Sequence, residues 1–217
     1  MSTIGVIGAG HIGRNVSLAA IANGYEIVIS NATGPEALTD LIRELGPRSR
    51  AATAADAAAA GDFALLAIPL TGADNLPVQS LADKIVLATC NYFPKRDGPF
   101  ADIDTGKLTV PGYLQTLLPA SKVTRVFNHI NAADIVSDGT PVGTPNRRAL
   151  GYAGDDPEGT RLAADLYEAF GFDAVDVGGL DEAWRLDVDQ PTFVVRQNKQ
   201  ELLDNLGKAR RRVTTAP

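Results

Sequence analysis

The chain has 217 residues, of which 45% are hydrophobic and 21% charged, with a formal net charge of −6. This length predicts one or two domains, and the composition is typical of a globular protein with a full hydrophobic core. Acidic and basic residues are interspersed, which argues against a nucleic-acid-binding surface. No apolar run approaches the roughly 18 residues of a membrane helix, and the first residues do not resemble a signal peptide.

The single cysteine, Cys90, excludes an internal disulfide and fits a reducing compartment. Two distant histidines and one cysteine give no credible zinc site, so no metal ligands are predicted. We therefore expect a soluble, cytoplasmic protein that binds neither membrane nor nucleic acid.

Short apolar runs alternate with helix-like segments through the first half of the chain. Strands are expected at 3–8, 25–30 and, weakly, 49–53, and helices at 11–23, 35–45 and 54–60. Residues 62–69, 84–91 and 122–128 are mainly apolar, as strands buried on both faces are. This alternation predicts an α/β fold, a doubly wound and mostly parallel sheet covered by helices.

The second half continues the pattern less regularly. Strands are expected at 149–154 and 172–178, and helices at 157–170 and 197–212. We expect one dinucleotide-binding domain over residues 1–190, followed by a C-terminal helix and tail over 191–217. The Pro- and Gly-rich stretches 94–113 and 139–146 are interpreted as long loops over a site.

A glycine-rich turn lies between the first strand and the first helix. Gly8 permits a tight turn, Gly10 lets the backbone approach a pyrophosphate, and Gly13 lets the helix pack against the strand. The start of the helix offers free N–H groups to phosphates. The motif and its context predict a Rossmann-type dinucleotide site.

The residues after the second strand bear on the choice of dinucleotide. An acid here would hold the ribose 2′-hydroxyl of NAD, but the sequence has Ser30, Asn31, Ala32 and Thr33. Without an acid, a 2′-phosphate is not repelled, and without Arg or Lys it is not strongly held. NADP(H) is favoured, chiefly by the missing acid.

Several fragments together resemble the F420-dependent NADP oxidoreductases: GVIGAGHIGRN, SNATGPEAL, LLAIPL, CNYFPKRDG and VFNHI, with AGDD and AWR further on. The resemblance covers roughly residues 1–190. It implies a Rossmann enzyme that moves a hydride between NADP(H) and the deazaflavin coenzyme F420. The domain is also similar to the cytosolic part of certain ferric reductases and, more distantly, to pyrroline-5-carboxylate reductases.

The resemblance assigns roles by position. The pyrophosphate would lie on Gly8, Gly10, His11, Ile12 and Gly13, and the adenosine phosphate near Ser30, Asn31, Ala32 and Thr33. The nicotinamide ribose would lie near Pro69, Leu70 and Asn91, and the nicotinamide and acceptor near Asn128, His129 and Ile130.

Two positions depart from the family's pattern. Ala32 and Thr33 replace the usual Ser-Arg, so a guanidinium that would hold the 2′-phosphate is missing. A hydrogen bond to a charged group contributes roughly 1.5–3 kcal/mol, so the preference for NADPH could shrink about 10- to 100-fold. His129 stands where the family more often has a small polar residue. This difference lies on the acceptor side of the site, so the acceptor can differ from that of the family.

The resemblance predicts an enzyme, an NAD(P)H-dependent oxidoreductase that uses a small-molecule hydride acceptor. Coenzyme F420 is the first expectation for that acceptor. The alternatives are a reductase of another small acceptor (an imine, quinone, flavin or ferric chelate) and a non-catalytic redox sensor that binds NADP(H). The resemblance to small reductases of this type implies that this protein forms a homodimer.

Some residues keep two interpretations. His129 either lines the acceptor pocket or bonds a nearby carbonyl structurally, and Cys90 is expected to be a buried packing residue. Lys95 and Arg96 either meet an anionic acceptor or lie on a solvated loop. Trp184 is expected to pack over the end of the sheet or in a subunit contact.

The residues of the C-terminal part also have two interpretations. Its apolar leucines either form a dimer surface or dock on their own domain, and its basic residues suit a solvated tail better than a docking patch. These residues are Leu202, Leu203 and Leu206, and Lys208, Arg210, Arg211 and Arg212.

Overall fold

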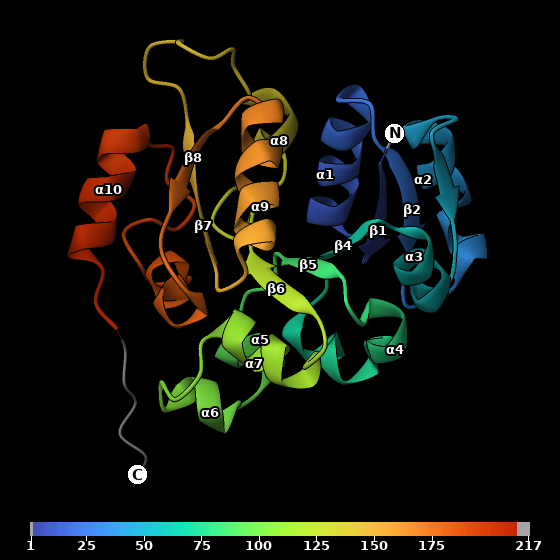
Figure 1. The fold of residues 1–217 in the computed structure, drawn as a ribbon, viewed down its shortest axis with the longest axis horizontal. Helices are drawn as coiled ribbons and strands as arrows, with labels where there is room; N and C mark the ends of the chain where they lie inside the picture. The colour runs from blue at the N-terminus through green and yellow to red at the C-terminus, as the bar shows by residue number, and fades with distance from the viewer. Residues whose placement is uncertain (1, 212–217) are drawn as a thin grey trace.

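A computed structural model describes residues 2–211 of the chain. Within that range eight strands form one sheet in the order β3-β2-β1-β4-β5-β6-β7-β8 (Figure 1). The strands are β1 (Thr3–Ile7), β2 (Glu26–Ser30), β3 (Ser49–Ala51), β4 (Phe63–Leu66), β5 (Ile85–Ala88), β6 (Lys122–Arg125), β7 (Ala149–Gly154) and β8 (Asp173–Asp176). The doubly wound α/β fold predicted from the sequence is confirmed.

The first six strands run parallel and end at one edge of the sheet. The register pairs Ile7 with both Ser30 and Leu66, Leu66 with Ala88, and Ala88 with Arg125. The loops that follow these strands therefore meet at one carboxyl edge, where ligands of open α/β sheets bind. By contrast, β7 runs antiparallel to β6, and β8 follows the direction of β7.

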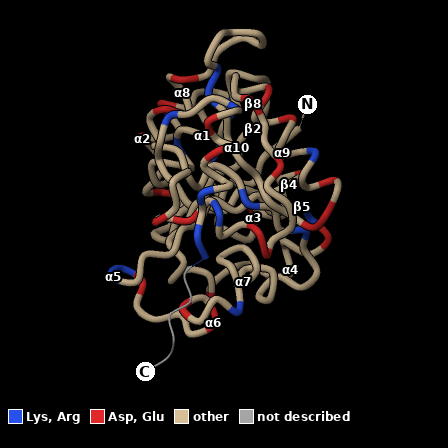
Figure 2. The backbone as a smooth tube through the Cα atoms, turned by 90° about the vertical axis from the view of Figure 1, so that its left-hand side faces the viewer, with Lys and Arg blue, Asp and Glu red and all other residues tan. Residues whose placement is uncertain are grey.

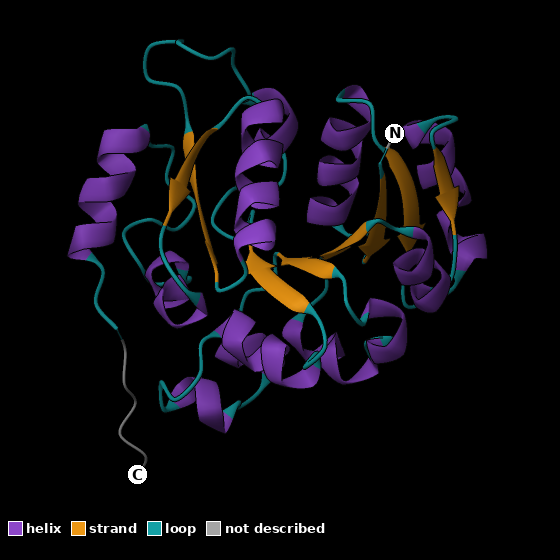
Figure 3. Ribbon diagram, viewed as in Figure 1, coloured by secondary structure: helices purple, strands orange, loops and turns teal. Residues whose placement is uncertain are grey.

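Helices cover both faces of the sheet (Figure 3). One face carries α1 (His11–Ala22), α2 (Thr39–Leu45), α8 (Asp134–Ser137) and α9 (Pro157–Ala169). The other carries α3 (Ala54–Ala60), the 3₁₀ helix η2 (Leu70–Asn75), α4 (Val78–Leu81), α5 (Pro94–Asp97), α6 (Ala101–Asp104) and α7 (Val110–Leu117). The remaining helical segments are the 3₁₀ helices η1 (Pro35–Leu38) and η3 (Leu180–Leu186), and α10 (Lys199–Lys208).

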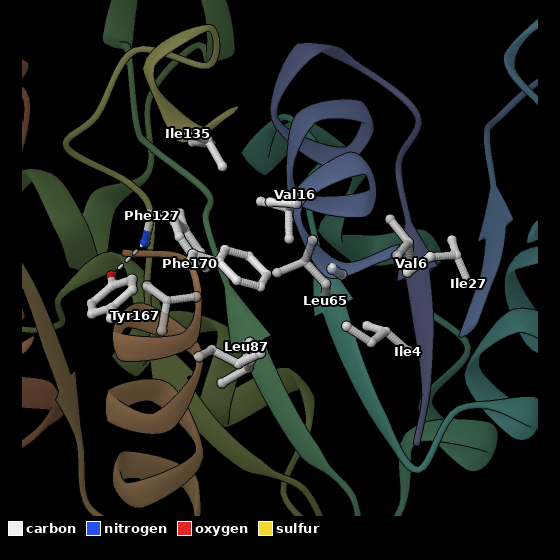
Figure 4. Packing of buried hydrophobic residues seen from close by; sticks show 14 of the residues in the cluster. Ile4, Val6, Val16, Ile27, Leu65, Leu87, Phe127, Ile135, Tyr167 and Phe170 are labelled. Carbon is white, nitrogen blue, oxygen red and sulfur yellow. Dashed lines mark hydrogen bonds between the residues drawn. The ribbon is translucent and has the colours of Figure 1, made fainter. Parts of the chain in front are cut away.

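The larger core cluster fills the space between the sheet and the helices α1, α2, α8 and α9. Figure 4 shows Val16 of α1 and Phe170 at the end of α9 converging on Leu65 of β4. The Tyr167 hydroxyl accepts a hydrogen bond from the backbone N–H of Phe127 at 2.8 Å and donates to the Gly151 carbonyl at 3.1 Å. The buried phenol therefore ties the end of β6 to β7.

Local signals in the sequence explain where the helices begin. Asp156 accepts hydrogen bonds from the backbone N–H groups of Glu158 and Gly159 at the start of α9. Asn198 and Glu201 form a capping box at the start of α10. Both helices were predicted, and both begin within two residues of the predicted positions.

Two sequence predictions need correction. Residues 94–113 are not one long loop, because α5, α6 and the start of α7 lie in this stretch, with Pro94 and Pro111 in the first turns of α5 and α7. The predicted helix 35–45 begins as the 3₁₀ helix η1 and becomes α-helical only at Thr39. Residues 139–146 form an irregular loop, as predicted.

The C-terminal helix packs on its own sheet. Leu202 and Leu206 of α10 are buried in a cluster with Ala149 of β7 and Val175 of β8. These two leucines therefore dock on their own domain, and only Leu203 of the three is exposed. Arg212 of the basic tail lies outside the described residues.

Lys and Arg positions and Asp and Glu positions are interspersed along the backbone rather than gathered by sign (Figure 2). Among the helices of residues 2–211, none is both long and apolar enough to cross a bilayer.

Candidate functional site

The glycine turn joins β1 to α1 with three differently constrained glycines. Gly8 has a φ of +110°, and a Cβ there would lie 2.3 Å from the Ala67 carbonyl oxygen. A Cβ on Gly13 would lie 1.9 Å from the carbonyl oxygen of Gly8. At Gly10, in contrast, a Cβ would meet nothing within 4 Å. Packing therefore explains the glycines at 8 and 13, while the space beside Gly10 is open.

The start of α1 can accept an anion. Gly10 is the N-cap residue and supplies no capping side chain. Within residues 2–211, the backbone N–H groups of His11, Ile12 and Gly13 have no hydrogen-bond acceptor. Together with the positive end of the helix dipole, these donors suit the pyrophosphate of a dinucleotide.

A broad cavity opens beside this turn. It measures about 650 Å³ and lies between the first turns of α1 and the segment around α8. His11 and Arg14 line one side, and Asn131 and Asp134 line the other. His11 is exposed, so its side chain is free to face a ligand there.

The turn after β2 holds itself by internal hydrogen bonds. Ser30 is buried and its hydroxyl donates to the Val6 carbonyl at 3.1 Å. Asn31 Oδ1 accepts from the backbone N–H groups of Thr33 and Gly34 at 3.1 and 2.8 Å. Ser30 and Asn31 therefore shape the turn, whereas Ala32 and Thr33 are exposed and available to a ligand.

Sequence reasoning missed an acid at this turn. Glu36, in the first turn of η1, places its Oε2 3.2 Å from where a Cβ on Gly34 would stand. The missed signal was the Gly-Pro-Glu sequence, since an acid is common in the first turn of a helix. Its carboxylate adds a negative charge beside the residues predicted to hold the adenosine phosphate.

The ends of β4 and β5 supply three further predicted residues. Pro69 is exposed, whereas the adjacent Leu70 begins η2 and is buried in the second core cluster. Asn91 is half-buried, and its Nδ2 donates to the Asn128 carbonyl at 2.7 Å. Its Oδ1 accepts from Arg125 Nη2 at 2.9 Å and from Asn128 Nδ2 at 3.2 Å, so the amide has one fixed orientation.

Asn128 and His129 lie just past β6 and are both buried. Asn128 Nδ2 also donates to the Leu186 carbonyl at 2.6 Å. The His129 ring accepts from the Gly151 N–H at its Nε2, 2.9 Å away, and its Nδ1 lies 3.3 Å from the Thr192 carbonyl. Burial lowers the pKa of His129 to about 4, so the ring is neutral at neutral pH. This geometry matches the structural alternative for its side chain.

Arg125, the last residue of β6, was not singled out from the sequence. Its guanidinium is fully buried, and Nη2 bonds both Asn91 Oδ1 and Asp187 Oδ1, the latter at 2.8 Å. Its Nε and Nη1 have no hydrogen-bond partner among the described residues. A lone Arg in the apolar run KVTRVFN was the available signal, because buried charges require partners.

Three other predicted residues have clear environments. Cys90 is buried, and this burial raises the pKa of its thiol to about 11, as expected of a packing residue. Lys95 and Arg96 are exposed on α5, and the Arg96 guanidinium bonds the Asp97 carboxylate at 2.6 Å.

The comparisons with known proteins agree with this architecture. Residues 3–92 match the family described as NADP oxidoreductase, coenzyme F420-dependent. A hypothetical protein from Sinorhizobium meliloti superimposes with a TM-score of 0.77 at 27% identity, covering 92% of this chain and 96% of that one. No match is found among curated proteins.

More distant solved structures share the fold. A protein from Arthrobacter sp. FB24, assigned as an F420-dependent NADP reductase, has a TM-score of 0.72 at 24% identity, over 84% of this chain and 87% of that one. An imine reductase variant from Myxococcus stipitatus in complex with NAD⁺ has a TM-score of 0.57 at 17% identity, over 84% of this chain and 58% of that one.

The resemblance predicted from sequence fragments is thus confirmed over the segment that carries the glycine turn and β1 to β5. Over residues 3–92 the chain is similar to the family of coenzyme F420-dependent NADP oxidoreductases, and the protein is an NAD(P)-dependent oxidoreductase built on a Rossmann-type sheet.

Proposed function

We propose that this protein transfers a hydride between NADP(H) and a small-molecule acceptor, with coenzyme F420 as the first acceptor to test. The single observation that supports NADP(H) binding is the contrast among the three glycines of the turn between β1 and α1. Gly8 and Gly13 are demanded by packing, whereas the space beside Gly10 is open, so a ligand can approach the backbone there. NADPH, when bound, supplies the hydride.

The chain's own residues divide the work of binding. The pyrophosphate is assigned to Gly8, Gly10, His11, Ile12 and Gly13; among the described residues, the amides of His11, Ile12 and Gly13 have no hydrogen-bond acceptor. The adenosine phosphate is assigned to the turn Ser30, Asn31, Ala32 and Thr33, and the nicotinamide ribose to Pro69, Leu70 and Asn91. All three segments follow strands that end at one edge of the sheet.

Asn128 and His129 are assigned to the acceptor side of the site. Because the ring of His129 is enclosed, we give it a positioning role: it fixes the turn after β6 through its bonds to Gly151 and Thr192. Hydride transfer requires alignment of two rings more than it requires an acid or a base.

A reductase of another small acceptor (an imine, quinone, flavin or ferric chelate) is the second candidate. The family match ends at residue 92, so it does not extend to Asn128 and His129. The proposal also includes a homodimer, which light scattering of the purified protein tests. It places the protein in the cytoplasm, which cell fractionation tests.

The decisive experiment follows the absorbance of NADPH or NADH mixed with the protein and, in turn, oxidised coenzyme F420, a flavin and a ferric chelate. Bleaching of the deazaflavin with NADPH is the expected result. Turnover of another acceptor alone would select the second candidate. Tight NADPH binding without turnover of any acceptor would favour a redox sensor instead.

A further inference from the structure

A second cavity, unrelated to the glycine turn, lies between α6, the start of α7 and the segment that follows η3. Its volume is about 180 Å³, and apolar and aromatic side chains form much of its wall: Tyr92, Ile103, Leu108, Val110, Trp184 and Val188. An apolar cavity of about 150 Å³ is enough to hold benzene. The cavity therefore has room for a ligand with one ring.

The charged residues of this wall are mainly acidic. Asp104, Asp187 and Asp189 line the cavity, and among the described residues of its wall the one cation is Arg211. Asp104 is already satisfied, since its oxygens accept from the Tyr92 hydroxyl at 2.8 Å and from the Phe100 N–H at 3.0 Å. Among the described residues, an anionic ligand would therefore meet three carboxylates and one cation on this wall.

Asp187 is the carboxylate with unused bonding capacity. Its Oδ1 is held 2.8 Å from Nη2 of the buried Arg125, and its side chain keeps 32% of its surface exposed. Within residues 2–211 its Oδ2 accepts no hydrogen bond. Arg125 thus fixes the carboxylate from behind and leaves one oxygen for a donor in the cavity.

We propose that this cavity binds a small, single-ring ligand that carries a protonated nitrogen, with Asp187 as its counter-ion. The aromatic walls suit both the ring and its positive charge, because cations are attracted to aromatic faces. The ligand's N–H group would donate to Asp187 Oδ2 and complete the hydrogen bonding of that carboxylate. The proposal concerns binding alone and does not depend on the proposed hydride transfer.

Trp184 makes the proposal measurable, because it is the only tryptophan in the chain and it lines the cavity. Benzylammonium, benzyl alcohol and benzoate are titrated into the full-length protein without NADPH, and tryptophan fluorescence is recorded. Benzylammonium is expected to change the fluorescence saturably, benzyl alcohol to bind more weakly, and benzoate to bind least.

Two variants distinguish the contribution of the Asp187 charge from that of the cavity volume. Asp187→Asn keeps an oxygen for Arg125 but removes the charge, so benzylammonium should lose about tenfold or more in affinity while benzyl alcohol changes little. Val188→Phe fills the cavity and should abolish both. Val195→Phe, at an exposed position outside the cavity, is the matched control.

The proposal is overturned if benzylammonium gives no saturable signal or if benzoate binds equally well. It is also overturned if the affinity for benzylammonium survives in Asp187→Asn or in Val188→Phe. Should Asp187→Asn fail to fold because it leaves Arg125 without its counter-ion, the charge series on the unmodified protein and Val188→Phe still decide the matter.

Discussion

The Nε2 atom of His129 lies 2.9 Å from the backbone nitrogen of Gly151 and accepts its hydrogen bond. The ring proton must therefore be on Nδ1, which faces the Thr192 carbonyl at 3.3 Å. Through this one buried ring, the turn after β6 is joined to β7 and to the segment that follows η3. A protonated ring could not accept from Gly151, so the arrangement requires a neutral histidine.

This requirement predicts a pH-dependent stability. Burial lowers the pKa of His129 from 6.5 to about 4, so the unfolded chain binds the proton more readily than the folded one. The free energy of unfolding should be fully retained above about pH 6.5 and should fall as the pH drops towards 4. The loss is on the order of 3 kcal/mol. Urea unfolding at several pH values measures it.

The variant His129→Gln provides the control for this prediction. It should be less stable at pH 7, because the ring's two bonds are lost, but its unfolding free energy should fall less steeply between pH 6.5 and 4. An equally steep fall in the variant would assign the pH dependence to other groups.

The glycine turn allows a loss of binding without a loss of folding. The Cβ introduced by Gly10→Val meets no protein atom within 4 Å, so thermal stability should change little. The same side chain would occupy the approach of the pyrophosphate, so NADPH binding should be abolished. Calorimetric titration and thermal unfolding measure the two effects separately.

Gly13→Ala is the contrasting variant, since its Cβ would collide with the Gly8 carbonyl oxygen. It should destabilise the fold by about 1–3 kcal/mol or more. Unimpaired NADPH affinity in Gly10→Val would argue against the pyrophosphate site.

The turn after β2 predicts how cofactor preference can be shifted. Thr33→Arg supplies a cation at an exposed position where the 2′-phosphate is expected, and should improve the affinity for NADPH about tenfold or more. Dissociation constants for NADPH and NADH check the selectivity. An equal gain for NADH would mean that the turn does not hold the 2′-phosphate.

Glu36 offers a second way to shift the same preference. Glu36→Gln removes the negative charge near Gly34 and should favour NADPH by roughly two- to fivefold, a size typical of an exposed charge. The affinity for NADH should stay constant in this variant. Weaker NADPH binding would place the phosphate elsewhere.

Cys90 should be inert in the folded protein. Burial raises its pKa to about 11, which leaves almost no thiolate at neutral pH, and the side chain is only 3% exposed. Iodoacetamide at pH 8 should leave the native protein unlabelled and modify one thiol per chain in urea. Rapid labelling of native protein would show that the end of β5 opens readily.

The sequence by itself determined the features that depend on local chemistry and periodicity. The glycine turn, the apolar strands β4, β5 and β6, and the helices with clear caps, such as α9 and α10, were all predicted near their observed positions. Propensity, capping and hydrophobic period act over a few residues, so one chain carries these signals without a partner.

Only the tertiary structure decided how distant segments combine. The reversed direction of β7 and β8, the enclosure of His129 and the pairing of Arg125 with Asp187 each join residues far apart in the chain. In the sequence, His129 after a strand is compatible with either a site residue or a core residue. Burial and the geometry of hydrogen-bond partners settle the environment of its side chain, because both are properties of the packed molecule rather than of any local segment.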